Sequence, residues 1–113
     1  KEKADMKLTN NLVVLDLETT GTWVDKDKIV EIAMIKIDTD GNREIFDKKV
    51  NPGMPIPLQV SELIGITDDD VKNAPKFSEI GQEVLAFISG CDLAGFNVSR
   101  FDLPLLRREV YED

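Results

Sequence analysis

The stretch that most constrains the fold is residues 12–21, which read Leu-Val-Val-Leu-Asp-Leu-Glu-Thr-Thr-Gly. It opens with four apolar residues, the pattern of a strand buried on both faces, and then carries Asp16 and Glu18. Side chains two residues apart in a strand point to the same face, so both carboxylates are expected to project from one side of a central strand. Gly21 and the two threonines before it then end the strand and bring backbone N–H groups near a bound ligand.

These two carboxylates need a cationic partner, because an acid that extends a core strand is costly to desolvate. No lysine or arginine lies between Leu8 and Asp25. A hard divalent cation such as Mg²⁺ or Mn²⁺ is the simplest compensation, since such ions prefer carboxylate oxygens. In the alternative interpretation, the strand frays into solvent and both acids are hydrated. The isolated Asp-x-Glu pair favours this alternative, and only its context reverses the preference.

Composition narrows the class of protein. The chain has 113 residues, 42% of them hydrophobic, which suits one domain with a real core. A formal net charge of −8 excludes a basic patch as the main source of nucleic-acid affinity, but not an enzyme whose acids hold metal ions. The single cysteine, Cys91, cannot form an internal disulfide and fits a reducing cytoplasm. No apolar run approaches the roughly 20 residues of a membrane span, and residues 1–8 are expected to be flexible or tag-derived.

Hydrophobic periodicity and turn signals predict a mixed α/β sheet with helices packed on it. Strands are expected over residues 12–18, 29–38, 43–50 and 93–96, with Asp40-Gly41 as a two-residue hairpin turn and the second strand buried on both faces. Helices are expected over 58–64, from Thr67, over 78–89 and over 102–111. Thr67 and Asp70 form a capping box, and the acids there are better explained by the helix dipole than by a metal.

Two further segments join the first stretch in a family resemblance. Leu-Asp-Leu-Glu-Thr-Thr-Gly resembles the first motif of the DEDD (DnaQ-like) 3′–5′ exonucleases, the family of the proofreading epsilon-type subunits. Residues 95–104 match the second motif with Asn97, Phe101 and Asp102. Residues 63–67 resemble the family's His-Gly-Ile-Thr loop, with Ile64 where histidine is usual. The resemblance extends from residue 12 to residue 109.

The resemblance implies a ribonuclease H-like fold and a two-metal reaction. Asp16, Glu18 and Asp102 would be the catalytic carboxylates and would hold two divalent cations, Mg²⁺ or Mn²⁺. The implied reaction is hydrolysis of phosphodiester bonds at a nucleic-acid 3′ end, with release of nucleoside monophosphates. The residues expected to contact the terminal nucleotide are Leu17, Thr19, Thr20, Gly21, Ile64, Asn97 and Phe101.

The family's third motif has no counterpart in these residues. It supplies a fourth acidic ligand and a His or Tyr general base, but the chain has no histidine, and its one tyrosine, Tyr111, lies in the helix of the second motif. We therefore expect residues 1–113 to be a single, partial exonuclease domain that lacks its last strand and helix and shows little activity by itself. An uncovered apolar sheet face is then expected to favour self-association.

Two other functions and several details stay open at this point. The chain is alternatively a non-catalytic nucleic-acid-binding or regulatory module on the same fold, or another two-metal phosphotransfer enzyme. We expect DNA rather than RNA as the substrate, with a DNA polymerase subunit as a possible partner and no membrane. Trp23 either packs on its own loop, the favoured interpretation, or stacks on a base at the rim of the site.

Overall fold

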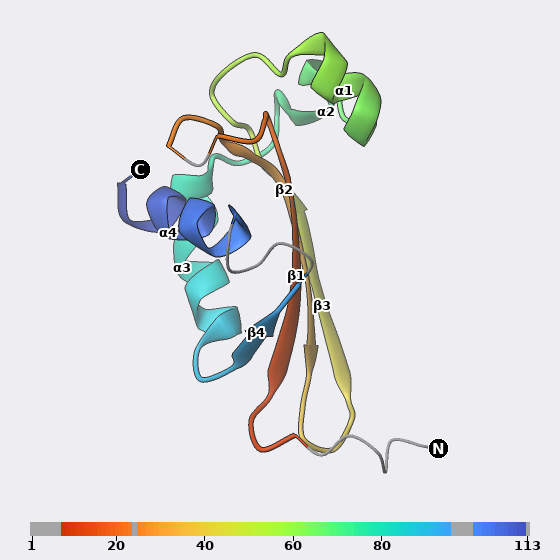
Figure 1. Cartoon of the computed structure of the whole chain (residues 1–113), viewed down its shortest axis with the longest axis vertical. Coiled ribbons are helices and arrows are strands. Elements are labelled where there is room, and N and C mark those ends of the chain that lie inside the picture. The colour runs from red at the N-terminus through yellow and green to blue at the C-terminus, as the bar shows by residue number, and fades with distance from the viewer. Residues whose placement is uncertain (1–7, 24, 96–100, 113) are drawn as a thin grey trace.

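The described residues form a four-stranded mixed sheet with two of their helices on one face (Figure 1). The computed structural model describes residues 8–23, 25–95 and 101–112, and the strand order is β3-β2-β1-β4. β1 pairs antiparallel with β2 and parallel with β4, and β2 pairs antiparallel with β3. The elements are β1 (Leu12–Thr19), β2 (Ile29–Ile37), β3 (Arg43–Lys49), α1 (Leu58–Ile64), α2 (Asp68–Val71), α3 (Phe77–Ile88), β4 (Asp92–Ala94) and α4 (Leu103–Glu112). The predicted mixed sheet with flanking helices is confirmed.

The helices fall into two groups (Figure 1). α3 and α4 lie side by side on one face of the sheet, whereas α1 and α2 lie beyond one end of it. The main core lies between the sheet and the pair α3 and α4, and a smaller cluster lies under α1 and α2. The smaller cluster is made by Val30, Ile56, Ile66 and Val71. None of the described helices is long and apolar enough to cross a membrane.

Burial along β1 alternates from residue to residue. Val13, Leu15 and Leu17 are buried against α3 and α4, while Val14 is 37% exposed and Asp16 is also exposed. The prediction that this strand is buried on both faces is therefore wrong for the described residues, and the same holds for β2, where Ile35 is 37% exposed. The physical reason is that the described helices cover one face only, which the hydrophobicity of a short run does not reveal.

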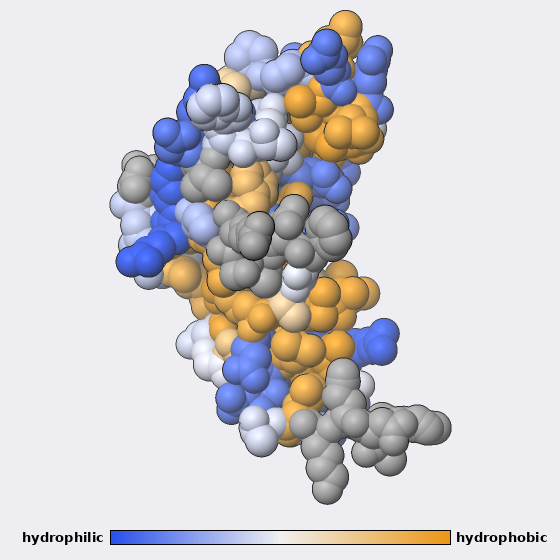
Figure 2. Space-filling view, viewed as in Figure 1, coloured by the Kyte–Doolittle hydropathy of each residue, from blue (hydrophilic) through white to orange (hydrophobic). Residues whose placement is uncertain are grey.

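The face opposite α3 and α4 carries an apolar row. Val14 lies opposite Ile35, and Ile35 lies opposite Ile45, which is 74% exposed. Figure 2 shows apolar side chains gathered over the sheet in the lower half of that view. The predicted uncovered apolar face is thus present among the described residues, and self-association through it stays a prediction.

Local sequence signals agree closely with the observed boundaries. α1 begins and ends as predicted, and Thr67 and Asp70 form the predicted capping box at the start of α2. Pro104 lies in the first turn of α4, where a missing N–H is tolerated. The hairpin between β2 and β3 is confirmed, but it is longer than predicted. The Asp38 N–H donates to the Asn42 carbonyl, and the Asp38 carboxylate accepts from Asp40 and Asn42.

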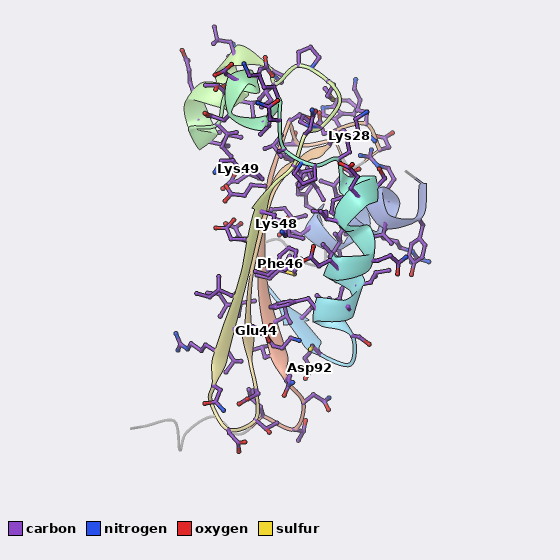
Figure 3. All side chains as sticks on the ribbon, turned by 180° about the vertical axis from the view of Figure 1, so that it is seen from behind. Lys28, Glu44, Phe46, Lys48, Lys49 and Asp92 are labelled. Atoms are coloured by element: carbon purple, nitrogen blue, oxygen red, sulfur yellow. The ribbon has the colours of Figure 1, made fainter. Side chains whose placement is uncertain are left out.

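The other face of β3 joins the sheet to α3. Phe46 and Lys48 point from β3 toward α3 (Figure 3). The rings of Phe46 and Phe87 are 5.4 Å apart between centroids, and the Lys48 Nζ lies 3.9 Å from a carboxylate oxygen of Glu83. The aromatic pair contributes about 0.5–1.5 kcal/mol beyond its buried area. These contacts fix α3 against the sheet.

Truncating Leu105, which is fully buried at the contact of α4 with the sheet, tests how far α4 stabilises the fold. We expect Leu105→Ala to lower the free energy of unfolding by about 2–5 kcal/mol, because it removes buried methyl groups and leaves a cavity. Urea unfolding followed by circular dichroism measures the loss. Leu63→Ala is the matched control: Leu63 is 84% exposed, so the change is expected to stay within about 0.5 kcal/mol.

Candidate active site

Asp16 and Glu18 project from the same side of β1. The register places Asp16 opposite Ala33 and Glu18 opposite Glu31, on the face away from α3 and α4. The register then shifts between Glu18 and Thr19, where β1 ends. Asp16 is exposed and Glu18 is half-buried. The predicted shared face of the two acids is therefore observed, in the inner strand β1 of the sheet.

Asp102 lies directly before α4 and is only 5% exposed. Phe101 and Asp102 have π-helical geometry, which is rare in proteins and frequent at functional sites. A nearly buried carboxylate at the beginning of a helix gains from the helix dipole, but it still pays a large desolvation penalty when charged.

The pKa values of Glu18 and Asp102 are both raised, first by burial and then in part by the charge of Asp16. The pKa of Asp102 is raised to about 6, first by burial and then by the charges of Asp16 and Glu18. Burial and then the charge of Asp16 raise the pKa of Glu18. Among the described residues none of the three acids forms an ion pair with lysine or arginine. Within the described residues, the charges of these acids thus interact and have no lysine or arginine as an ion-pair partner.

The donor set fits a hard divalent cation in its chemistry. It offers only carboxylate oxygens, and the carboxylate of Asp102 is nearly buried. The charge of Asp16 raises the pKa of both Glu18 and Asp102, after burial in each case. Within residues 8–23, 25–95 and 101–112, however, no three acidic or cysteine side chains are close enough together to hold an ion as they stand. Bare carboxylates about 5 Å apart would repel by roughly 3 kcal/mol at an effective dielectric near 20, so a closer arrangement of these acids needs a cation.

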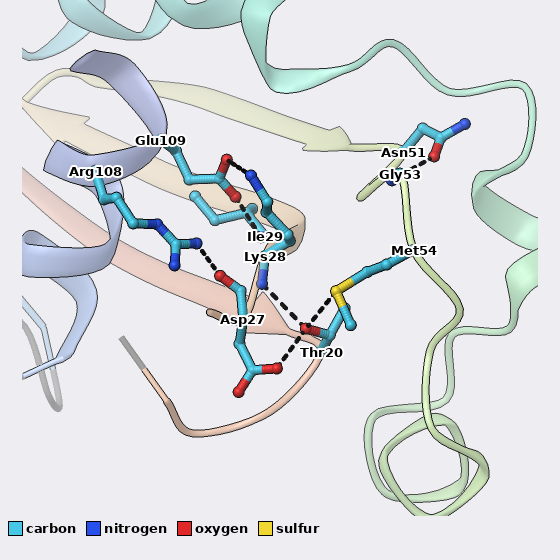
Figure 4. A network of polar contacts seen from close by, with 9 residues as sticks. All are labelled: Thr20, Asp27, Lys28, Ile29, Asn51, Gly53, Met54, Arg108 and Glu109. Carbon is cyan, nitrogen blue, oxygen red and sulfur yellow. Dashed lines mark hydrogen bonds and ion pairs between the residues drawn. The ribbon is translucent and has the colours of Figure 1, made fainter. Parts of the chain in front are cut away.

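The connection that follows β1 is held by its own side chains (Figure 4). Thr19 donates its hydroxyl to the Gly21 carbonyl at 2.6 Å. Thr20 is 1% exposed; its hydroxyl donates to Asp27 at 2.9 Å, and its N–H donates to the Lys28 carbonyl at 2.9 Å. Of the groups predicted to hold a nucleotide, the Thr20 side chain and N–H are thus already paired within the loop.

The remaining predicted contact residues are spread over the structure. Leu17 is buried in the main core, so its backbone is what a ligand would meet. Ile64 packs half-buried against the smaller cluster, and Phe101 packs against the main core. Asn97 lies outside the described residues. Trp23 is 63% exposed with the Lys26 ammonium 5.1 Å from its ring centroid, so it extends from the loop with this cation over its face. The contacts of these residues with a nucleotide stay predictions.

Sequence reasoning missed a second pair of acids beside Glu18. Glu31 on β2 has its pKa raised to about 7, first by a side-chain hydrogen bond with Asp47, then by burial and by the charges of Asp47 and Glu18, with Lys49 acting in the opposite direction. A hydrogen bond between two carboxyl groups requires a proton on one of them, so the contact with Asp47 favours the protonated form of Glu31. The signal was available: Glu31 interrupts an otherwise apolar run in β2.

A methyl group at Gly21 is expected to disturb the loop beside these acids. A Cβ built there would lie 2.8 Å from the Asp27 Cγ, and that carboxylate is held by Thr20 and by the Trp23 N–H. We expect Gly21→Ala to lower the free energy of unfolding by about 1–3 kcal/mol, measured by thermal and urea unfolding. Gly81→Ala in α3 is the control, because its Cβ would meet Phe77 at 3.8 Å and should stabilise the helix by about 0.5–1 kcal/mol.

Two curated proteins are similar in sequence to most of this chain. The chain is 43% identical over 107 residues to a DNA polymerase III subunit epsilon-like protein of Rhodobacter capsulatus, covering 91% of this chain and 15% of that protein. It is 35% identical over 101 residues to the 3′-5′ exonuclease DinG of Bacillus subtilis, covering 88% of this chain and 11% of that protein. The chain thus spans less than a sixth of the length of these curated relatives.

The fold has a solved counterpart. The structure of E. coli exonuclease I in complex with a dT13 oligonucleotide matches with a TM-score of 0.80 and 20% identity, covering 91% of this chain and 24% of that chain. At that identity the match shows a shared fold. Residues 13–112 match the RNase T family model, described as Exonuclease, which takes in both β1 with its acids and α4 with Asp102. The chain belongs to the RNase T family of exonucleases, the DEDD group whose first two motifs its sequence resembles.

Proposed function

We propose that this domain catalyses metal-dependent 3′–5′ exonucleolytic hydrolysis of DNA and releases nucleoside monophosphates. The observation that supports the proposal is the nearly buried Asp102, whose pKa is raised by burial and then by the charges of Asp16 and Glu18, with no lysine or arginine paired with these acids among the described residues. Three acids without a counter-charge are unstable unless a cation completes the site. Membership of an exonuclease family is the second support.

Each acid has a role in this proposal. Asp16 and Glu18 from β1 and Asp102 from the start of α4 would hold two divalent cations, Mg²⁺ or Mn²⁺. When bound, such cations lower the pKa of a water molecule and stabilise charge on the leaving oxygen. The backbone near Leu17, Thr19 and Gly21, with Ile64, Asn97 and Phe101, would position the terminal nucleotide. We propose cytoplasmic DNA replication or repair as the setting, with a DNA polymerase subunit as a partner, in keeping with the epsilon-like relative.

Single-stranded DNA is the substrate that the charge balance favours. With a net charge of −8, the chain lacks the clustered lysines and arginines that grip long duplexes. A single-stranded end that is held through cations needs fewer lysines and arginines. E. coli exonuclease I, which has the same fold, was solved in complex with a dT13 oligonucleotide.

The test uses the natural gene product that contains these residues and a single-stranded oligodeoxynucleotide labelled at its 5′ end. We expect a ladder of products that shorten from the 3′ end with Mn²⁺ or Mg²⁺ and no products with EDTA. Phosphorothioate linkages at the 3′ end should block the ladder, while the same linkages at the 5′ end serve as the control. Binding without cleavage would instead favour the non-catalytic module, and RNA of the same sequence separates the two nucleic acids.

The 113-residue chain itself is expected to show little digestion, because it contains no histidine and only one tyrosine, on α4, to act as general base. It should nonetheless bind Mn²⁺, which titration calorimetry measures directly. Robust metal-dependent digestion by this chain alone would contradict the need for a base outside these residues.

A further inference from the structure

A buried polar network joins the loop after β1 to α4 (Figure 4). Its loop side is centred on Asp27, which is 7% exposed. The Asp27 carboxylate accepts from the Thr20 hydroxyl at 2.9 Å and from the Trp23 N–H at 2.8 Å. The Thr20 hydroxyl in turn accepts from the Lys28 N–H at 3.0 Å. The end of β1 and the beginning of β2 are thus held in one arrangement.

Two consecutive residues of α4 attach the helix to this loop. Arg108 donates from its guanidinium to the Asp27 carbonyl. Glu109, which is 2% exposed, accepts from the Ile29 N–H at 2.8 Å, and its second oxygen lies 3.7 Å from the Lys28 Nζ. Glu109 therefore satisfies a backbone donor at the first residue of β2, where a lost acceptor would leave a buried N–H unpaired.

The position of this attachment matters for Asp102. A helix rises about 1.5 Å per residue, so Arg108 and Glu109 lie about 9 and 10.5 Å along the axis from Asp102. The loop they hold begins directly after Glu18 and Thr19. α4 therefore follows directly after one proposed cation ligand, Asp102, and less than two turns later it contacts the loop that follows the strand with the other two ligands.

The buried carboxylates of this network are not needed merely to stabilise the folded state. Two nearly buried carboxylates, Asp27 and Glu109, lie in the network, and well-packed apolar residues often stabilise a fold at least as well as buried ions. Directional hydrogen bonds hold the groups that they join in a defined orientation. When a group that orients a metal ligand is removed, the affinity for the metal typically falls by about 10–100-fold.

We infer that Arg108 and Glu109 are positioning residues, which set the distance of Asp102 from Asp16 and Glu18 by clamping α4 to the loop 20–29. The inference rests on the proposed function, because it concerns the same cation site. The clamp residues themselves bind neither cation nor nucleic acid. They act through the placement of α4.

The test compares two adjacent arginines by titration calorimetry with Mn²⁺. Arg108→Ala removes the contact with the Asp27 carbonyl, and we expect the Kd for Mn²⁺ to rise about 10-fold. Arg107→Ala removes the same charge from an exposed position on the same helix and is expected to change the Kd by less than about twofold. Arg108→Lys keeps a donor and should recover part of the affinity.

Two further variants separate positioning from general loss of stability. Glu109→Gln keeps an acceptor for the Ile29 N–H but loses the charge facing Lys28, and it should fold and weaken Mn²⁺ binding. Ile80→Val in the core under α3 is expected to lower stability without changing the Kd. Equal Kd values for Arg108→Ala and Arg107→Ala, or a Kd that follows unfolding free energy across all variants, would overturn the clamp. If the wild type binds no Mn²⁺, the cation site of the proposed function fails first, and the clamp has no role.

Discussion

Replacing Asp16 with asparagine is expected to abolish Mn²⁺ binding by the 113-residue chain and to lower the exonuclease activity of the natural gene product by about 100-fold or more. Asp16 interacts with both of the other acids, because its charge raises the pKa of Glu18 and of Asp102. Asparagine has nearly the same shape but removes one negative charge and one strong oxygen ligand. The fold should therefore survive while the cation site does not.

The control for this change is Asp40→Asn, an identical chemical substitution at an exposed residue of the hairpin between β2 and β3. Calorimetry with Mn²⁺ and the 5′-labelled digestion assay are run on both variants, with circular dichroism to verify the fold. If Asp16→Asn binds Mn²⁺ as tightly as the wild type, the three acids are not a cation site.

Replacing Asp102 with asparagine is expected to stabilise the metal-free protein at pH 7 by about 1–3 kcal/mol. The pKa of Asp102 is raised to about 6, mainly by burial and then by Asp16 and Glu18, whereas an aspartate in an unfolded chain has a pKa of about 3.9. The folded state therefore holds this proton more tightly than the unfolded state. The charged carboxylate destabilises the fold, and an amide of similar size removes that penalty.

Because the pKa of Asp102 is higher in the folded state than in the unfolded state, its contribution to stability depends on pH. Below about pH 4 the Asp102 carboxyl is neutral in both states, so wild type and Asp102→Asn should be equally stable. As the pH rises from about 4 through 6, the unfolded state loses the proton first, and the contribution of Asp102 to wild-type stability decreases. Above this range both states are ionised, so the difference between the two proteins should stay constant.

Urea unfolding at a series of pH values measures this difference, with Asp92→Asn on β4 as an exposed control of the same chemistry. Saturating Mn²⁺ should stabilise the wild type and reverse the order of the two proteins at pH 7, because the cation balances the charge that asparagine lacks. A constant stability difference from pH 3 to pH 8 would contradict the burial of Asp102. Such a trade of stability for binding is typical of functional sites.

Local elements were predictable because their signals are local. The Thr67 and Asp70 capping box and Pro104 in the first turn of α4 depend on residues three or four positions apart, and the structure has both where the sequence predicts them. The same applies to Asp16 and Glu18, since strand geometry alone puts alternate side chains on one face. The pairing of these acids with Asp102 came from the family resemblance, because no local rule relates residues 16 and 102.

What the amino-acid sequence determined by itself was the strands and helices, the shared face of Asp16 and Glu18, and the family. Only the tertiary structure decided that Val14 faces away from the helices, that Glu31 and Asp47 extend the acidic region, and that Asp27 and Glu109 are buried. Burial depends on which segments cover a surface, and charge coupling depends on distances across strands and helices. Both are set by packing between segments far apart in the chain, which periodicity and spacing do not encode.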